Sequence, residues 1–165
     1  MDKKTLDSIS LVGAQPGTLY GTCKVHKDVY PLRPVISMIK TSEYFLAKYL
    51  DTFIQPNIPI AYCVNSTSQF LDFLKGYSFG PTDKMVSFDV VSLFTNIPLK
   101  EPIEIIENRV YSVYTKLLHI ASEGMFIFND KLYCQTDGVA MGSPLGPSFA
   151  NFFLGHIGEN VGRSG

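Results

Sequence analysis

The stretch KMVSFDVV, residues 84–91, constrains the fold most, because five of its eight residues are apolar and three of these are the β-branched valine. A run of this kind is typical of a β-strand that is buried on both faces. The run predicts such a strand, with Asp89 near its C-terminal end. A single carboxylate at that place either holds a metal ion or caps the turn that follows, residues 91–95.

The rest of the chain alternates between strand and helix patterns. Strands are predicted at residues 19–25, 32–38 and on both sides of Asn129 and Asp130, where turn chemistry favours a hairpin. Helices are predicted at residues 43–54, 65–76, 99–119 and from about residue 143, where Ser143 can cap the helix and Pro144 can take its first position. This order favours an α+β chain with helices packed on an antiparallel or mixed sheet.

The composition bounds the class of protein. The chain has 165 residues, of which 45% are hydrophobic and 18% charged, as expected for one globular domain. No apolar run approaches the roughly 18 residues of a membrane span, and the first ten residues lack the apolar core of a signal peptide. The three cysteines form no CxxC pair and the three histidines are scattered, so the pattern predicts an intracellular protein without a zinc site. It does not distinguish nucleus from cytoplasm.

The charge is unevenly distributed although the net charge is only −1. Residues 1–50 contain seven Lys or Arg against four Asp or Glu, a balance of +3, whereas residues 51–165 contain seven against eleven, a balance of −4. The basic first third could bind the phosphates of a nucleic acid, while the acidic remainder holds a metal ion. Ordinary solvated surface charge is the alternative.

Other residues allow both a functional and a structural reading. Phe94 could exclude a ribose 2′-hydroxyl beside a bound nucleotide, or could simply fill the core. Glycines such as Gly138 and Gly142 let a backbone approach a ligand, and the helix that starts near Ser143 favours negative charge, but a hairpin-to-helix turn needs the same residues. The basic residues of the first two strands could grip a triphosphate or face solvent: Lys24, Lys27 and Arg33.

Four segments taken in order carry a resemblance. GTCKVHK, PLRPVIS, SFDVVSLFTNIPL and QTDGVAMGSPLGPSFANFF follow one another along the chain. Together they resemble the motifs of reverse transcriptases, most closely those of Penelope-like retroelements, from about residue 20 to about residue 154. The resemblance implies a right-hand polymerase fold, with an N-terminal segment at 1–16, a fingers-like part at 17–84 and part of the palm at 85–165.

The resemblance also implies roles for single residues. Asp89 would be the first metal-binding carboxylate, and the main-chain carbonyl of Val90 would contact the same ion. Phe94 would be the steric gate, and Gly142, Ser143 and Pro144 would shape the pocket for nucleotide and template. Lys24 and Arg33 would contact the incoming triphosphate, with Lys27 as a helper.

The implied reaction is RNA-templated DNA synthesis. The 3′-hydroxyl of a DNA primer would attack the α-phosphate of a deoxynucleoside triphosphate, and two Mg²⁺ ions, or Mn²⁺ in their place, would assist. The implied partners are therefore an RNA template, a DNA primer and deoxynucleoside triphosphates, without a membrane. The oligomeric state is not implied.

The sequence departs from the family pattern after GVAMGSP. The family continues into a palm hairpin with two adjacent aspartates, but this chain contains no Asp-Asp, and Glu159 follows a helix pattern instead of a strand. We therefore expect a C-terminally truncated domain without that hairpin and the thumb, inactive as an isolated chain. A non-catalytic, nucleic-acid-binding remnant is the main alternative, and an unrelated α+β domain in which Asp89 caps a turn is the third.

Overall fold

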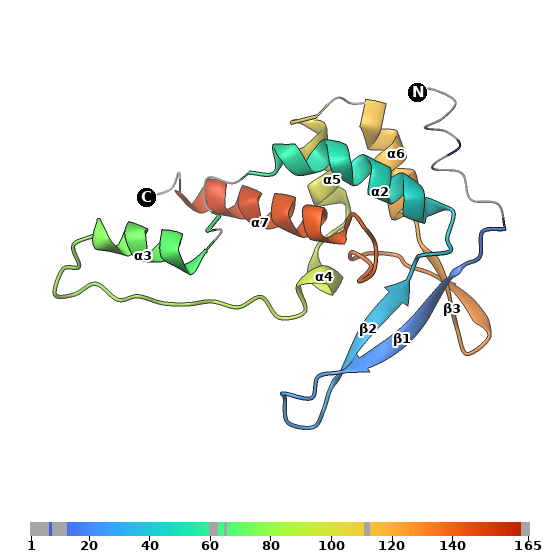
Figure 1. Cartoon of the computed structure of the whole chain (residues 1–165), viewed down its shortest axis with the longest axis horizontal. Coiled ribbons are helices and arrows are strands. Elements are labelled where there is room, and N and C mark those ends of the chain that lie inside the picture. Colours follow the sequence, from blue (N-terminus) through green and yellow to red (C-terminus); the bar gives the residue numbers. More distant parts are fainter. Residues whose placement is uncertain (1–6, 8–12, 60–62, 65, 111–112, 163–165) are drawn as a thin grey trace.

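The computed structural model describes residues 7, 13–59, 63–64, 66–110 and 113–162 (Figure 1). Within these residues the chain forms six α-helices, one 3₁₀ helix and one sheet of four strands. The α+β class predicted from the sequence is confirmed. No helix in the described ranges combines the length and the apolar character that crossing a membrane requires.

The sheet is mixed and has the strand order β2-β1-β3-β4. Strand β1 (Gly17–Cys23) pairs antiparallel with β2 (Leu32–Ser37), and its first residues pair parallel with β3 (Met125–Phe128). Strand β4 (Lys131–Cys134) returns antiparallel to β3 after a turn at Asn129 and Asp130. Both turn residues have positive φ angles, 49° and 57°, as a two-residue hairpin turn with right-handed strand twist requires. The two predicted hairpins are thus confirmed to within a few residues.

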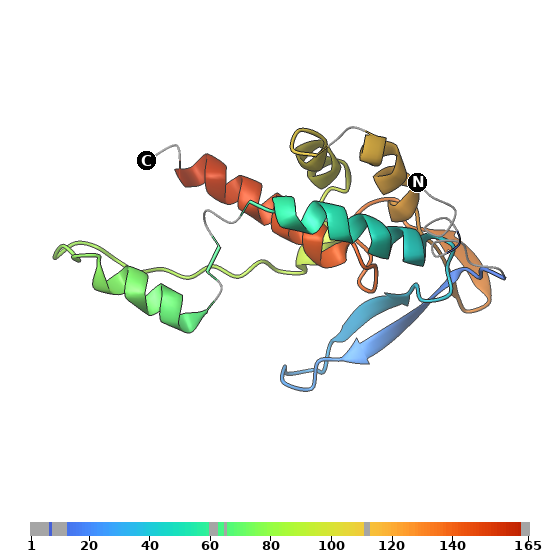
Figure 2. The same ribbon diagram turned by 45° about the horizontal axis from the view of Figure 1, so that its top comes forward.

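Four helices enclose the core. Helix α2 (Glu43–Ile54) packs against α6 (Val113–Ser122), and α5 (Lys100–Glu107) packs against α7 (Gly146–Gly162). A hydrogen bond from the Ser148 hydroxyl to the Asp51 carboxylate connects α7 to α2. Figures 1 and 2 show this group of helices at one end of the β1–β2 ribbon, which projects away from it. The most deeply buried large side chains come from these helices and the loops before them: Leu50, Ile54, Ile97, Ile103, Ile106, Leu118, Leu145, Phe149 and Phe152.

The helix predicted at residues 99–119 is wrong as a single element. Helix α5 ends at Glu107, a turn follows at residues 108–110, and α6 begins at Val113. Ile103 and Ile106 are buried where α5 meets α7, whereas Leu118 is buried in α6, which packs against α2. Helices α5 and α6 also pack against each other, which two halves of one straight helix could not do, so the chain turns between them.

The strand predicted at residues 84–91 is also wrong. Helix α3 (Thr67–Lys75) lies within the helix predicted at residues 65–76. It is capped by Ser66, whose hydroxyl accepts from the main-chain N–H of Gln69 at 3.2 Å, and Gly76 follows it. From there to Ser92 the chain belongs to no helix or strand, and α3 and this connection extend away from the other helices (Figures 1 and 2). A strand exists only where its N–H and C=O groups meet a partner strand, and the described residues supply none there.

Candidate functional site

Main-chain hydrogen bonds join the loop between β4 and α7 to two other parts of the chain. The main-chain N–H of Ile36, in β2, donates to the carbonyl oxygen of Met141 at 2.9 Å. The N–H of Val139 donates to the carbonyl oxygen of Phe94 at 2.7 Å, and Phe94 lies in the short helix α4 (Leu93–Asn96). Each of these two bonds joins segments that are more than 40 residues apart in sequence. Together they hold the loop beside both β2 and α4.

Two glycines in this loop are required by its conformation. Gly138 has a φ of 79°, and a Cβ atom there would lie 3.0 Å from the carbonyl oxygen of Thr95. Gly142 has a φ of 123°, and a Cβ atom would lie only 2.1 Å from the carbonyl oxygen of Ile36. Both the positive φ and the close backbone approach exclude a larger residue. The close approach at these glycines is therefore to the protein's own backbone.

The entry to α7 differs from the prediction by two or three residues. The helix begins at Gly146, so Pro144 precedes its first turn and does not take the first helical position. Ser143 stabilises the turn before the helix: its hydroxyl accepts from the N–H of Leu145 at 3.3 Å, and its carbonyl oxygen accepts from the N–H of Gly146 at 3.1 Å. The difference has a local cause, because Ser143 caps this preceding turn and not the helix itself.

A cavity of about 360 Å³, here called the hairpin cavity, lies between the β1–β2 ribbon and α4. Three residues predicted for nucleotide binding meet there: Lys24 directly after β1, Arg33 in β2, and Phe94. Arg33 is paired with Thr22 across the ribbon, which fixes its place in the register. The remaining lining residues are Leu32, Pro34, Ser92, Leu93, Thr95 and Met141.

A second cavity of about 520 Å³, here called the helix cavity, shares two lining residues with the first, Phe94 and Met141. The loop supplies Gly142, Ser143 and Pro144, and the Phe94 ring approaches the start of α7, since a Cβ atom on Gly146 would lie 3.6 Å from its Cε1. The sequence reasoning missed the residues that α2 contributes: Tyr44, Lys48 and Asp51. Their spacing of four and three residues places them on one helical face, which is a detectable signal, but only the packing shows that this face meets the loop.

Asp89, Val90 and Lys27 line neither cavity. Asp89 is exposed on the unpaired connection, and Val90 is 49% exposed beside it. Lys27 is exposed in the turn between β1 and β2, where its carbonyl oxygen accepts from the N–H of Tyr30 at 3.2 Å. The structure thus brings six of the nine predicted residues around two adjoining cavities and leaves these three outside.

The described residues do not fit a two-metal centre. They contain no group of three His, Cys, Asp or Glu side chains placed to hold one metal ion. Asp89 lies on an irregular segment, not on the rigid strand end that would hold a carboxylate in place for an ion without reorganisation. A magnesium site at Asp89 would need ligands beyond those that the described part of the chain places beside it.

Asp137 is the one described residue whose pKa departs clearly from its ordinary value. Main-chain N–H groups hold its pKa below the usual range: Leu99 donates to Oδ1 at 2.9 Å and Gly138 at 2.8 Å, and the charge of Lys100 adds to the effect. Hydrogen bonds to the ionised form favour it, which lowers the pKa. Asp137 therefore connects the glycine-bearing loop to the start of α5.

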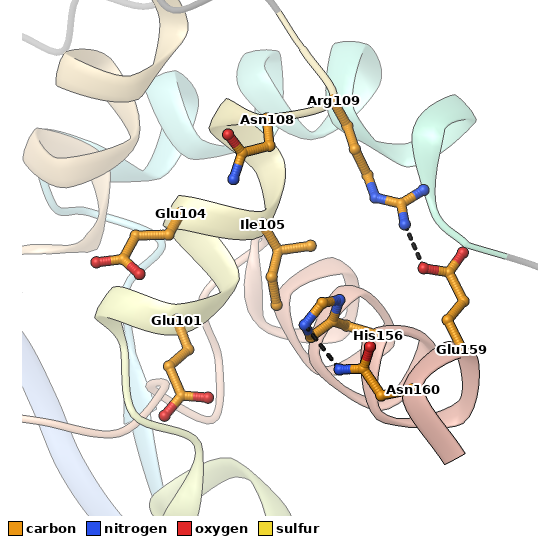
Figure 3. Close-up of a pocket in the computed structure, with 8 residues that line it drawn as sticks. All are labelled: Glu101, Glu104, Ile105, Asn108, Arg109, His156, Glu159 and Asn160. Atoms are coloured by element: carbon orange, nitrogen blue, oxygen red, sulfur yellow. Dashed lines mark hydrogen bonds and ion pairs between the residues drawn. The ribbon is translucent and has the colours of Figure 1, made fainter. Parts of the chain in front are cut away.

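A third cavity lies between α5 and α7 and contains none of the predicted site residues (Figure 3). Arg109 forms an ion pair with Glu159, and the Asn160 amide donates to Nε2 of His156 at 3.0 Å. The carboxylates of Glu101 and Glu104 point away from α7 in Figure 3, so the acidic groups do not converge on one point.

No protein-family model matches this chain, and no match to it was found among curated proteins.

Proposed function

We propose that the hairpin and helix cavities together bind a deoxynucleoside triphosphate, in a domain of the reverse transcriptase type. The observation that carries the proposal is the position of Phe94, which lines both cavities. Phe94 lines the hairpin cavity together with the cations Lys24 and Arg33, and it lines the helix cavity together with Gly142 and Ser143. A nucleotide needs this combination of a cationic end and an adjoining space for sugar and base.

Lys24 and Arg33 would bind the triphosphate in the hairpin cavity. The Arg guanidinium presents a planar fork that matches two phosphate oxygens, and the Lys ammonium adds a compact charge. Arg33 lies in β2, and Lys24 directly follows β1, the strand that pairs with β2. The register of the two strands therefore sets the separation of the two side chains. The formal positive charge of the two residues would offset part of the charge of the triphosphate.

Phe94 would select the sugar. It is half-buried and packs against the hydrophobic core, and its carbonyl oxygen is held by the N–H of Val139. A ring restrained in this way cannot move aside to admit a 2′-hydroxyl without disturbing the loop. The helix cavity beside it, with Lys48 and Asp51 from α2, offers space for the base and for a template strand.

The proposed reaction is template-directed addition of deoxynucleotides to a primer. In such reactions bound Mg²⁺ supplies the positive charge that stabilises the transferring phosphate. Because Asp89, the carboxylate predicted to hold the metal, lines neither cavity, we expect the isolated chain to bind nucleotides without adding them to a primer. The loss of an essential catalytic group typically lowers the rate by a factor of ~10³ or more.

Titration with a fluorescent dTTP analogue tests the binding site. We expect Arg33→Ala and Lys24→Ala each to weaken binding about tenfold, because a hydrogen bond to a charged group contributes roughly 1.5–3 kcal/mol. Lys27→Ala is the matched control: it removes the same charge from the exposed turn outside both cavities and should leave dTTP binding unchanged. Equal affinity in all three variants, or no binding by the wild-type chain at millimolar dTTP, would refute the site.

A second titration tests the role of Phe94. Phe94→Ala should reduce the preference for dTTP over UTP, because the space for the 2′-hydroxyl opens. Circular dichroism must show that the variant remains folded, since the ring also contacts the core. An unchanged ratio of the two affinities in a folded variant would remove the steric gate from the proposal.

Primer extension separates binding from catalysis. With poly-rA template, oligo-dT primer, dTTP and Mg²⁺ or Mn²⁺, we expect no product above background from the purified chain. Robust synthesis that disappears in Asp89→Asn would contradict the expected inactivity, while supporting the reaction itself.

A nucleic-acid-binding role without catalysis is the second candidate, and the exposed position of Lys27 at the tip of the ribbon favours it. A salt-dependent shift of a primer–template duplex would support this role. Here Lys27→Ala should weaken binding and reduce the slope of affinity against salt concentration. No shift at low salt would count against it.

A further inference from the structure

The connection at residues 84–91 has an unpaired main chain. Within the described part of the chain, residues 84–90 form no main-chain hydrogen bond, and the carbonyl oxygen of Val91 accepts only the side-chain amide of Asn96, at 3.0 Å. Figures 1 and 2 show this connection drawn out away from the sheet, so nothing of the described fold blocks access to it. Unpaired extended main chain of this kind is a template for strand addition.

The side chains of the same segment are apolar and exposed. Phe88 is 91% exposed and Val91 is 80% exposed, and three neighbours are also open to solvent: Met85, Val86 and Val90. Such a run of exposed apolar side chains is unusual on the surface of a folded protein and marks an interaction surface or an aggregation-prone segment.

The sequence of this segment is complementary to itself when two copies run antiparallel. With Phe88 opposite Phe88 of a second copy, Val86 faces Val90, Met85 faces Val91, and Ser87 faces Asp89. Apolar residues then face apolar residues throughout, and the only carboxylate faces a hydroxyl that can donate to it. Cross-strand pairs of this kind are the unit of sheet stabilisation.

The neighbouring symmetric registers are worse. A two-fold axis between antiparallel strands passes through one residue paired with itself, because facing side chains must lie on the same side of the ribbon. An axis at Ser87 places Met85 opposite Asp89, and an axis at Val86 places Asp83 opposite Asp89. An axis at Asp89 places two carboxylates directly opposite each other, which is destabilising. Only the axis at Phe88 matches every pair.

We propose that two copies of this chain associate through residues 85–91, which form an antiparallel ribbon with Phe88 on the two-fold axis. A closed two-fold pair is the commonest symmetric assembly. The inference goes beyond nucleotide binding and does not depend on it, since the segment lines neither the hairpin cavity nor the helix cavity. In the dimer, Asp89 accepts from the Ser87 hydroxyl of the second copy, so pairing and a metal ion compete for this carboxylate.

Sedimentation velocity over a range of protein concentrations tests the association. We expect a monomer–dimer equilibrium for the wild-type chain. Phe88→Asp places two like charges on the axis and should raise the dissociation constant at least tenfold. Phe79→Asp is the matched control: it adds the same charge at a residue that is 53% exposed but outside the segment, and the dimer should persist. A monomer at every concentration, or equal effects of the two substitutions, would overturn the proposal, as would assemblies larger than a dimer.

Disulfide trapping tests the register. Cys23, Cys63 and Cys134 are first replaced by serine, since all three are free thiols. Phe88→Cys should then cross-link on mild oxidation, because facing Cα atoms lie about 4.5–5.5 Å apart. Val90→Cys should not, since the two copies of residue 90 are offset by four positions, about 13 Å along the strands. Preferential cross-linking of Val90→Cys or Ser87→Cys would overturn this register.

Discussion

The main-chain N–H of Val139 donates a 2.7 Å hydrogen bond to the carbonyl oxygen of Phe94. This bond joins the glycine-bearing loop to α4 at the residue that lines both candidate cavities. Phe94 is therefore held from two directions, by its ring in the core and by its carbonyl at the loop. We therefore expect substitutions in the loop to alter the position of Phe94 even where the substituted residue lines neither cavity.

Replacement of Gly142 by alanine tests the close approach of the loop to β2. A Cβ atom would lie 2.1 Å from the carbonyl oxygen of Ile36, at a φ of 123°. We expect Gly142→Ala to lower the free energy of unfolding by at least about 2 kcal/mol in urea titrations, because both the clash and the backbone strain act. Gly13→Ala is the control for strain alone, since Gly13 has a φ of 77° with nothing within 4 Å of the added atom. Equal losses in the two variants would show that the contact with β2 is unimportant.

The turn between β1 and β2 contains a strained residue, and its replacement should stabilise the protein. Val29 is β-branched, 93% exposed and has a φ of 67°, a conformation that disfavours L-residues by roughly 1–2 kcal/mol. Val29→Gly should therefore raise the free energy of unfolding by about 1 kcal/mol, after the added chain entropy of the unfolded state is allowed for. Val25→Gly, at an exposed residue of the same turn without positive φ, should bring no gain. Thermal denaturation of the two variants side by side measures the difference.

The core should depend strongly on Phe152. This side chain is fully buried in α7, and its truncation in Phe152→Ala should lower the free energy of unfolding by about 3–5 kcal/mol. Phe73→Ala removes the same atoms from α3, where the ring is 69% exposed, and should change the free energy by less than about 0.5 kcal/mol. Urea titrations compare the two. A large loss in Phe73→Ala would mean that α3 packs against another part of the chain in solution.

Asp137 should contribute a pH-dependent part of the stability. The hydrogen bonds from Leu99 and Gly138 lower its pKa in the folded state, so the folded protein binds a proton at this group less readily than the unfolded chain does. The contribution is fully present above the unfolded value of about 3.9 and is lost as the pH falls through the lower folded pKa. Urea midpoints between pH 6 and the acid limit measure it.

In Asp137→Asn the amide oxygen can still accept from both N–H groups, but the charge is absent. We expect this variant to show a flatter loss of stability below about pH 4 than the wild-type chain. An identical pH profile in the two proteins would mean that the carboxylate does not stabilise the loop. Asp137→Ala, which removes the acceptor as well, should be less stable than the asparagine variant at neutral pH.

Local chemistry predicted many of the elements. Helix α3 lies within the range predicted for it, between Ser66 and Gly76, and Asn129 and Asp130 form the turn of the second hairpin. These features depend on residues a few positions apart, whose preferences act before any long-range contact forms. The break between α5 and α6 could not be read in this way, because it arises from packing against α7 and α2.

For the candidate site, residue type indicated which side chains matter but not which of them meet. Lys24, Arg33 and Phe94 line one cavity, whereas Asp89 lies outside it. Lys48 and Asp51 of α2 were identified as cavity residues only from the structure. An amphipathic helix does not itself reveal which segment lies opposite its polar face.

The sequence by itself determined the α+β class, the two hairpins and the approximate ranges of α2 and α3, because each follows from short-range backbone preference and side-chain periodicity. The tertiary structure decided the rest. It placed β2, α4 and the loop before α7 around Phe94 through main-chain hydrogen bonds between distant segments. It also left residues 84–91 without the strand that their apolar pattern predicts, since a strand's hydrogen bonds belong to two segments and cannot be formed by one alone.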